Sequence, residues 1–247
     1  MALAGGLQKV SEKFMGISVE KGGPDLSLLS DPKVRDALSA LMNESRLAAR
    51  WGGLSPRTRQ AHQAILRAFL TKGAPPATSE FSAETLADLS ARDLVHVRDD
   101  EIALAYPFSA RPTDFQVRLG GVTVHAICAV DALGTAAMAG TAAEVTCTCP
   151  ICRTGVSINI ASDGLAVEHA SRPEARVWTG VKDVGACAAE SQCKTMLLFC
   201  APEHLEAWRR SQPSSARGFD LSLAEAVQLG AAIFRPFIQA PGDRVAS

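Results

Sequence analysis

The spacing of hydrophobic residues predicts helices in the first half of the chain. Three segments begin with a residue type that caps helix N-termini, and the apolar residues that follow recur on one helical face. The expected helices start at Asp31-Pro32, Ser55-Pro56 and Ser82. Glycine at position 73, with prolines at 75 and 76, predicts the end of the second helix. Two short strands, 94–97 and 102–105, are expected next, around a turn at Asp99 and Asp100.

From about residue 112 onward, apolar and polar residues alternate, as in strands that bury one face of a sheet. The expected strands are 115–119, 122–125, 144–148, 156–160, 165–169, 175–178 and 193–200. An alanine-rich run at 126–138 predicts a buried helix. Pro202 opens another helix, and Ser222 with Glu225 predicts a capping box at the start of the last one. The whole pattern predicts an α+β fold with a mixed β-sheet and helices.

The same pattern divides the chain into three expected parts. Residues 1–30 are glycine-rich without sustained periodicity and are expected to form a flexible extension. Residues 31–110, helices followed by a hairpin, are expected to form a winged-helix-like helical domain, and residues 111–240 a mixed-sheet domain that carries the chemistry. A winged helix on its own suggests DNA binding. Because basic residues are not concentrated here, we favour a packing or lid module.

Composition and charge narrow the range of functions. With 247 residues, 47% of them hydrophobic, the chain can bury a core. Lys and Arg total 25 against 26 Asp and Glu, a net charge of −1, so nucleic acid is not an expected partner. No apolar run reaches the roughly 18 to 20 residues that span a bilayer, and residues 1–6 lack a signal-peptide pattern. We therefore expect no membrane partner and a cytoplasmic location.

Seven cysteines, an odd number, favour thiolate chemistry or metal binding in a reducing compartment. Cys128 and Asp131 are three residues apart, which places a thiol and a carboxylate on one helical face if the helix begins near residue 127. We expect the helix N-terminus to lower the thiol pKa and the apolar surroundings to raise the pKa of Asp131. Taken alone, however, the pattern also fits a buried cysteine near an exposed aspartate, which is the more common case.

A second group of cysteines has the spacing of a metal-binding loop. Three thiols lie within six residues, at Cys147, Cys149 and Cys152, a loop spacing that suits zinc, with Cys187 as a candidate fourth ligand. Surface thiols without a metal fit the same spacing equally well. No two histidines have ligand spacing, so a histidine-based metal site is not expected.

Cys193 opens the expected strand at 193–200, beside Lys194, where a sheet end can meet the helix of Cys128. Cys200, on the opposite face of that strand, is interpreted as a core residue because cysteine is among the most buried residue types.

These residues lie in segments that resemble the alkylmercury lyases, the bacterial organomercurial lyase family. The segment His125-Ala-Ile-Cys128-Ala-Val-Asp131-Ala-Leu is similar to the one that holds the family's first catalytic cysteine and its catalytic aspartate. Cys193-Lys-Thr-Met-Leu-Leu-Phe199, continuing through Trp208, is similar to the strand and helix with the second catalytic cysteine. Residues 146–158 resemble a segment with a non-catalytic cysteine, here Cys149. The resemblance covers roughly residues 58–237, with Ile127 and Lys194 at places where the family often has an aromatic residue and another cysteine.

The resemblance implies cleavage of a carbon–mercury bond by protonolysis. Cys128 and Cys193 would bind the mercury, which prefers thiolates, and Asp131 would deliver the proton to carbon. The products would be a hydrocarbon and Hg²⁺, passed on to small thiols or a mercuric reductase, with no organic cofactor.

Two other functions remain open from the sequence. One is a metal-binding or metal-sensing protein with zinc at Cys147, Cys149, Cys152 and Cys187, whose helical module contacts DNA or a partner. The other is a diverged family member that acts on a non-mercurial substrate in the same pocket.

Overall fold

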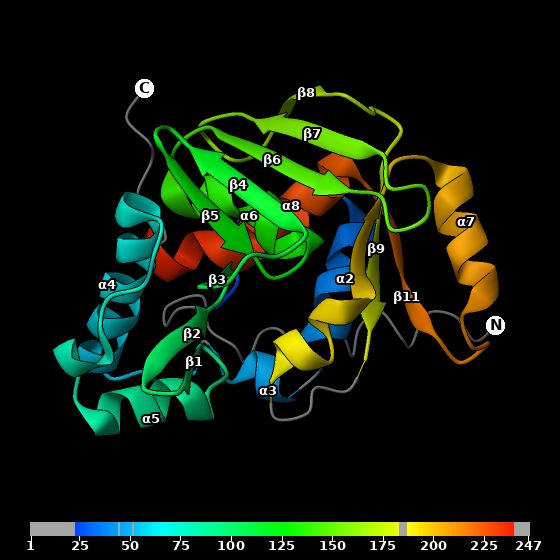
Figure 1. Ribbon diagram of the computed structural model, residues 1–247. Coiled ribbons are helices and arrows are strands. Elements are labelled where there is room, and N and C mark those ends of the chain that lie inside the picture. Colours follow the sequence, from blue (N-terminus) through cyan, green and yellow to red (C-terminus); the bar gives the residue numbers. More distant parts are fainter. Residues whose placement is uncertain (1–22, 44, 51, 183–186, 240–247) are drawn as a thin grey trace.

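The structure is a computed structural model that describes residues 23–43, 45–50, 52–182 and 187–239. It confirms the α+β class, with a large sheet on one side of a pair of central helices, α6 and α8 (Figure 1). The helices are α2 (Pro32–Met42), α3 (Ser45–Ala48), α4 (Pro56–Lys72), α5 (Ala83–Ala91), α6 (Ala129–Ala139), α7 (Pro202–Ser211) and α8 (Leu223–Ile238). The described residues also form short 3-10 helices: η2 (Leu26–Leu28), η3 (Thr78–Glu80), η4 (Ala188–Glu190) and η5 (Cys193–Thr195).

The strands form an eight-stranded sheet in the order β1-β2-β3-β5-β4-β6-β7-β8 and a three-stranded sheet in the order β10-β9-β11. Those of the large sheet are β1 (Val95–Arg98), β2 (Glu101–Ala105), β3 (Phe108–Ser109), β4 (Phe115–Leu119), β5 (Val122–Ala126), β6 (Ala143–Thr148), β7 (Gly155–Ile160) and β8 (Val167–Ala170). Those of the small sheet are β9 (Arg176–Val181), β10 (Met196–Phe199) and β11 (Arg217–Ser222). Within the described residues every strand pair is antiparallel, where a mixed sheet was expected. Short connections reverse the chain direction between most neighbouring strands. Such connections can join antiparallel strands, whereas parallel strands need a long crossover.

Side-chain caps set the helix starts that the sequence predicted. The Asp31 carboxylate accepts a hydrogen bond from the Lys33 amide at 2.7 Å, and Ser55 accepts one from the Thr58 amide at 3.1 Å. Each satisfies an amide that has no partner inside its helix. Gly73 ends α4 in the left-handed conformation, at φ +76°, as its glycine predicted.

Helices α6 and α8 pack against each other at unusually short range. Helix α6 is buried on nearly every side, which its alanine-rich sequence predicted, and it lies between the large sheet and α8. Gly134 of α6 faces Gly230 of α8, and a Cβ added at Gly134 would lie 2.6 Å from the Gly230 carbonyl oxygen. Two glycines are therefore needed for the backbones to approach this closely.

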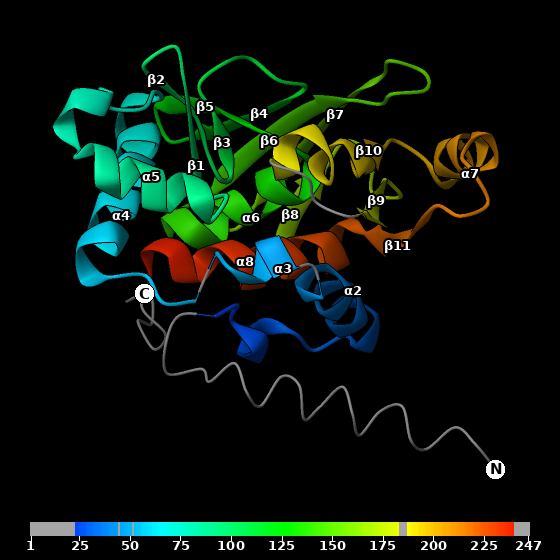
Figure 2. The ribbon, with the colours of Figure 1, turned by 90° about the horizontal axis from the view of Figure 1, so that it is seen from below.

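The expected division into three parts stays a prediction, but two of its boundaries cross continuous structure. Strand β3 pairs with β5, so the large sheet continues across the expected boundary near residue 110. Residues 1–22 of the expected extension lie outside the described residues. The rest of it packs on α8: the Asp25 amide donates to the Ala232 carbonyl at 2.7 Å, and Leu29 is buried. Helix α2 also packs on α8 (Figure 2), and no described helix is long and apolar enough to cross a membrane.

Candidate active site

Cys128 lies at the junction between β5 and α6. It is the N-cap residue of α6, with extended backbone, so the helix begins at Ala129 and not near residue 127 as expected. Its side chain makes no capping hydrogen bond, and its Sγ lies 3.5 Å from the Met196 Sδ. Asp131 follows in the first turn of the helix. The start of α6 therefore presents a thiol and a carboxylate one turn apart, the arrangement predicted from their spacing.

Cys193 reaches the same place from the small sheet. It lies in the 3-10 helix η5, and the strand β10 begins only at Met196, so the predicted strand alternation from residue 193 is wrong at its start. The Gln192 side chain fixes this turn to β9, since it donates to the Gly180 carbonyl and accepts from the Lys182 amide at 2.8 Å. Cys193 is thereby held toward Asp131, with its Sγ 3.9 Å from the carboxylate Oδ2.

Cys128, Asp131 and Cys193 together form what we call the thiol–carboxylate cluster. One ligand atom from each lies within 4.8 Å of the other two, and their exposed fractions are 1%, 4% and 7%. Two sulfurs and one oxygen are thus close enough to contact one bound atom.

Burial controls the protonation of this cluster. It raises the pKa of Asp131 to about 7, in the direction predicted, because the charged carboxylate loses its contact with water. Burial also raises the pKa of the Cys128 thiol well above its ordinary value, which contradicts the expected lowering by the helix N-terminus. For Cys193, a hydrogen bond with Cys128 lowers the pKa, but burial and the neighbouring Asp131 outweigh it and raise the pKa overall. Near neutral pH, both thiols are therefore protonated in the absence of a bound ligand.

A buried cation, Arg50, faces the cluster from the N-terminal segment. Its guanidinium donates to Asp93 Oδ2 at 2.6 Å and lies 3.8 Å from the centre of the Tyr106 ring. Its positive charge favours the ionised forms of both Cys193 and Asp131. The sequence analysis missed Arg50 because a lone arginine carries no signal of its own, and its partner is 43 residues away.

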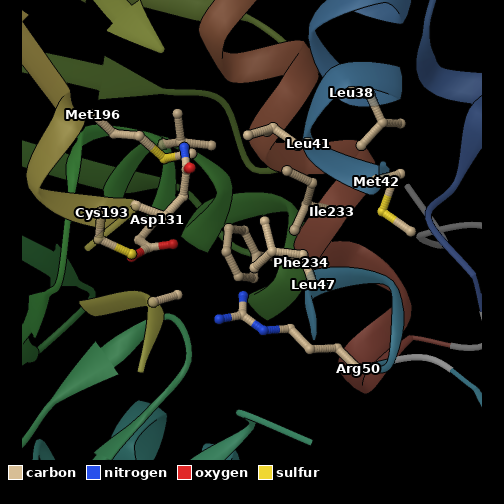
Figure 3. Close-up of a pocket in the computed structure, with 13 residues that line it drawn as sticks. Leu38, Leu41, Met42, Leu47, Arg50, Asp131, Cys193, Met196, Ile233 and Phe234 are labelled. Carbon is tan, nitrogen blue, oxygen red and sulfur yellow. The ribbon is translucent and has the colours of Figure 1, made fainter. Parts of the chain in front are cut away.

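An apolar pocket opens beside the thiol–carboxylate cluster. Its cavity volume is only about 30 Å³, so it is narrow, and it is partly open to solvent. Figure 3 shows Asp131, Cys193 and the Arg50 guanidinium on one side, facing apolar side chains on the other. The apolar residues of α2, α3 and α8 that line it are Leu38, Leu41, Met42, Leu47, Ile233 and Phe234. Helices α2 and α3, from the N-terminal part of the chain, therefore form part of the pocket wall.

Comparison with known proteins now adds to this geometry. The sequence pattern of the alkylmercury lyases matches residues 108–235, which include the whole thiol–carboxylate cluster. The chain belongs to the alkylmercury lyase family. Members of this family are enzymes that cleave carbon–mercury bonds, and their role is mercury detoxification. No curated protein matches the chain.

A solved structure shares the fold of this alkylmercury lyase. It is described as the mercury-bound form of MerB2, with a TM-score of 0.66 and 19% sequence identity. The match covers 85% of this chain and 100% of the other. At this identity the likeness supports the fold, including part of the chain outside residues 108–235, while the family pattern supports the enzyme class.

The cysteines outside this cluster are arranged differently from the prediction. Cys187, the expected fourth zinc ligand, lies instead with Asp93 and His96. His96 Nε2 donates a hydrogen bond to Asp93 Oδ1 at 2.7 Å, and this bond, with one to Cys187, raises the pKa of His96 to about 9. Cys187 is also 3.6 Å from the Tyr106 hydroxyl.

The expected trio of Cys147, Cys149 and Cys152 is not brought together either. Cys147 is buried in β6, whereas Cys149 and Cys152 meet Cys200 and His204. Cys200 is buried, as expected of a core residue, but its sulfur also lies beside the other members of this group. The spacing of the histidines did not indicate that a single one, His204, would join the cysteines. Sequence spacing missed this group because its two halves are separated by 48 residues or more.

Proposed function

We propose that this alkylmercury lyase cleaves organomercurials with Cys128 and Cys193 as the mercury-binding thiols and Asp131 as the proton carrier. The observation that carries the proposal is the convergence of two sulfurs and one carboxylate oxygen within 4.8 Å, with Asp131 and Cys193 in the wall of an apolar pocket. Mercury is a soft metal, so it prefers paired thiolates. The carboxyl group supplies what the thiolates cannot, a proton for carbon.

The reaction starts from a substrate R–Hg–X, in which X is a small thiolate. The Cys128 sulfur bonds to mercury, and X leaves with the Cys128 proton as HX. The Cys193 proton then passes to the Asp131 carboxylate, 3.9 Å away, and the Cys193 sulfur bonds to the same mercury. Two sulfur donors increase the electron density on mercury and weaken its bond to carbon. Asp131 finally protonates that carbon, which gives R–H and Hg²⁺ held by the two cysteines.

The pKa of Asp131 suits both halves of this proton transfer. A carboxyl group with a pKa of about 7 is a stronger base than an ordinary aspartate, so it can accept the thiol proton. It is still acidic enough to protonate a carbon that carries most of the electrons of the Hg–C bond. The apolar residues of α2 and α8 would contact the organic group and keep water from the carbon.

The product is Hg²⁺ bound by two buried cysteines, which needs an acceptor. We infer that small thiols, or the thiols of a mercuric reductase, remove it by ligand exchange. All seven cysteines are free thiols, which fits a reducing compartment such as the cytoplasm. Mercury enters as substrate and leaves as product in this scheme, and no organic cofactor takes part.

The test is release of benzene from phenylmercury by the purified protein in excess thiol, followed by gas chromatography. We expect catalytic release with the wild type and none above the thiol-only rate with a Cys128→Ala, Cys193→Ala double variant. Cys147→Ala, a buried cysteine outside the cluster, is the matched control. Benzene release by the wild type no faster than by thiol alone would refute the proposal.

A further inference from the structure

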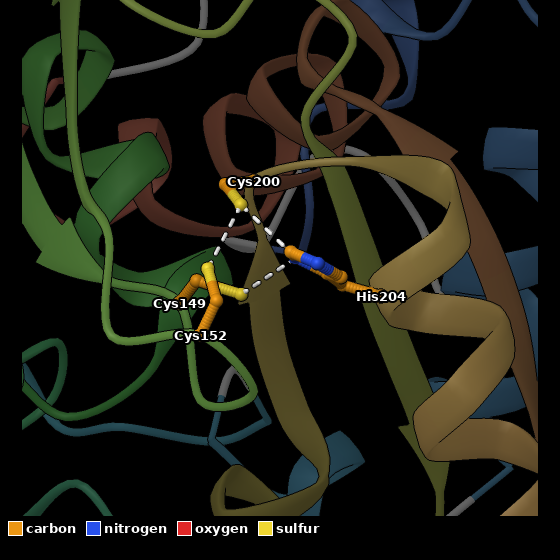
Figure 4. Close-up of side chains that lie close together, drawn as sticks. All are labelled: Cys149, Cys152, Cys200 and His204. Atoms are coloured by element: carbon orange, nitrogen blue, oxygen red, sulfur yellow. Dashed lines mark hydrogen bonds between the residues drawn. The ribbon is translucent and has the colours of Figure 1, made fainter.

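The second group of cysteines forms a site of its own, at the other end of β10 from Cys193. We propose that Cys149, Cys152, Cys200 and His204, here called the Cys/His cluster, bind one zinc ion with a structural role (Figure 4). Three sulfurs and one imidazole nitrogen are a common ligand set for structural zinc.

The positions of the four ligand atoms fit one small ion. All lie within 4.8 Å of one another. The Cys152 and Cys200 sulfurs are 3.5 Å apart, and His204 Nδ1 lies 3.5 Å from the Cys149 sulfur and 3.1 Å from the Cys200 sulfur. Sulfurs that bind tetrahedral zinc at about 2.3 Å stand roughly 3.8 Å from each other. The three distances above therefore lie within roughly half an ångström of those in a tetrahedral zinc site.

The first pair of ligands is presented by the turn between β6 and β7. The Arg153 amide donates to the Cys149 carbonyl at 2.9 Å, and the Cys149 amide donates to the Thr154 carbonyl at 2.9 Å. Arg153 takes the left-handed conformation, at φ +61°, which closes the turn tightly. This backbone brings the sulfurs of Cys149 and Cys152, separated by two residues, to the same side of the loop.

The second pair comes from the junction of β10 and α7. Cys200 follows the last residue of β10, and His204 lies in the first turn of α7, which Pro202 opens. The first helical turn points the imidazole back toward the strand end, so both ligands face the β6–β7 turn in Figure 4. A strand end and a helix start thus supply the second half of the site, each from regular structure.

Four protein ligands leave no open position for a substrate, which separates this site from the thiol–carboxylate cluster. The ion would join the large sheet, through the β6–β7 turn, to the small sheet, through β10. The exposed side chain of Cys152 provides an entry path for the metal, while Cys149 and Cys200 are buried. Because η5 with Cys193 leads directly into β10, the ion would hold the far end of the strand that follows the mercury-binding turn.

Metal content of the full chain, purified without any mercurial, tests the proposal. After desalting, we expect elemental mass spectrometry to find about one zinc per chain in the wild type. We expect Cys152→Ala to have lost that zinc. Cys152 is the best first variant because its exposed side chain contributes little to packing. Cys147→Ala, two residues from Cys149 on the same strand end, should keep the zinc.

Two further measurements distinguish loss of the zinc site from misfolding of the variant. Replacement of zinc by Co²⁺ in the wild type should give the visible absorption bands of tetrahedral cobalt with thiolate ligands, absent in Cys152→Ala. A strong chelator should remove the zinc and lower the thermal unfolding midpoint of the wild type, and added zinc should restore it. A folded wild type without zinc, a Cys152–Cys200 disulfide in its place, or zinc lost only with Cys128 and Cys193 would each overturn the proposal.

Discussion

The Cys193 sulfur lies 3.9 Å from an oxygen of the Asp131 carboxylate, and both side chains are buried. A buried thiol therefore lies beside a carboxyl group whose pKa, about 7, lets it take and return a proton near neutrality. In the proposed mechanism, mercury binding by Cys193 and proton delivery by Asp131 are coupled through this contact, and substitutions at the two residues should separate them.

Replacement of Asp131 by Asn should separate binding from turnover. The amide keeps the shape of the side chain but cannot carry the proton, so benzene release should fall by about 10² to 10⁴. The two thiols are untouched, and phenylmercury should still bind, as mass spectrometry of the intact complex would show. Turnover at the wild-type rate would mean that another group protonates the carbon.

Replacement of either cluster cysteine should weaken binding as well as turnover. Cys128→Ala and Cys193→Ala each leave a single sulfur for mercury, so the complex with phenylmercury should exchange readily with competing thiol. Competition with dithiothreitol, monitored by mass spectrometry, measures this directly. Cys147→Ala is the control for a buried thiol lost elsewhere, and tight binding retained by both cluster variants would contradict the assigned roles.

Asp131 should also make the protein less stable as pH rises. Its pKa is raised from 3.8 to about 7 on folding, so the folded chain holds the proton more tightly than the unfolded chain. The associated stability is fully present below pH 3.8 and is lost as pH rises to about 7. Asp131→Asn removes this effect, so from pH 5 to pH 8 the variant should gain roughly 2 to 3 kcal/mol relative to the wild type.

Urea unfolding of both proteins at the two pH values measures the difference. The comparison cancels the titrating groups that do not interact with Asp131, since both chains share them. A stability difference that stays constant from pH 5 to pH 8 would show that the carboxyl group of Asp131 is not perturbed by burial.

Arg50 should tune the pH at which mercury binds. Its charge lowers the pKa of Cys193 and Asp131, so Arg50→Met should move the pH of half-maximal phenylmercury binding upward. Arg50→Lys, which keeps a positive charge, should move it less. Arg50→Met also leaves Asp93 with one cation partner fewer and should cost about 3 kcal/mol of stability. Loss of stability without any shift of the pH profile would limit Arg50 to a structural role.

The glycine contact between α6 and α8 gives a test of packing alone. A Cβ at Gly134 would lie 2.6 Å from both the Gly230 carbonyl oxygen and the Phe234 ring. Gly134→Ala should therefore lower the free energy of unfolding by about 1 to 3 kcal/mol or more, measured by urea titration. Ala132→Gly in the same helix tests the opposite change, a loss of helix propensity without a clash. Wild-type stability of Gly134→Ala would show that the helices can separate freely.

Local signals predicted most of the fold. Helix starts at Asp31, Ser55 and Ser222 depend on a side chain and an amide two or three residues away, so the sequence contains the whole interaction. The Cys128 and Asp131 spacing is local in the same sense. By contrast, the order of the strands and their antiparallel pairing depend on how distant segments meet, which alternation alone does not specify.

The contacts that local spacing could not establish are all long-range. Cys193 is 62 residues from Asp131, and the sequence joined them only through the expectation that a sheet end meets the helix of Cys128 and through the family resemblance. Cys200 and His204 have no local signal that points to Cys149 and Cys152, because the ligands meet only when β6 and β10 are placed. The predicted direction of the Cys128 pKa shift was wrong for a related reason. The surroundings that bury it come from other elements, and their effect outweighs that of the helix N-terminus.

The close contact of Gly134 and Gly230 also bears on how the enzyme could adapt to new substrates. Helix α6 carries Asp131, and α8 carries Ile233 and Phe234 of the pocket wall, so moving these helices apart would break their close packing. We therefore expect space for a bulkier organic group to come from the opposite wall, at Leu38, Leu41, Met42 and Leu47. That wall lies outside residues 108–235, the part that carries the family pattern. Evolution could therefore change substrate range through the N-terminal helices while the reaction chemistry stays fixed in the rest of the chain.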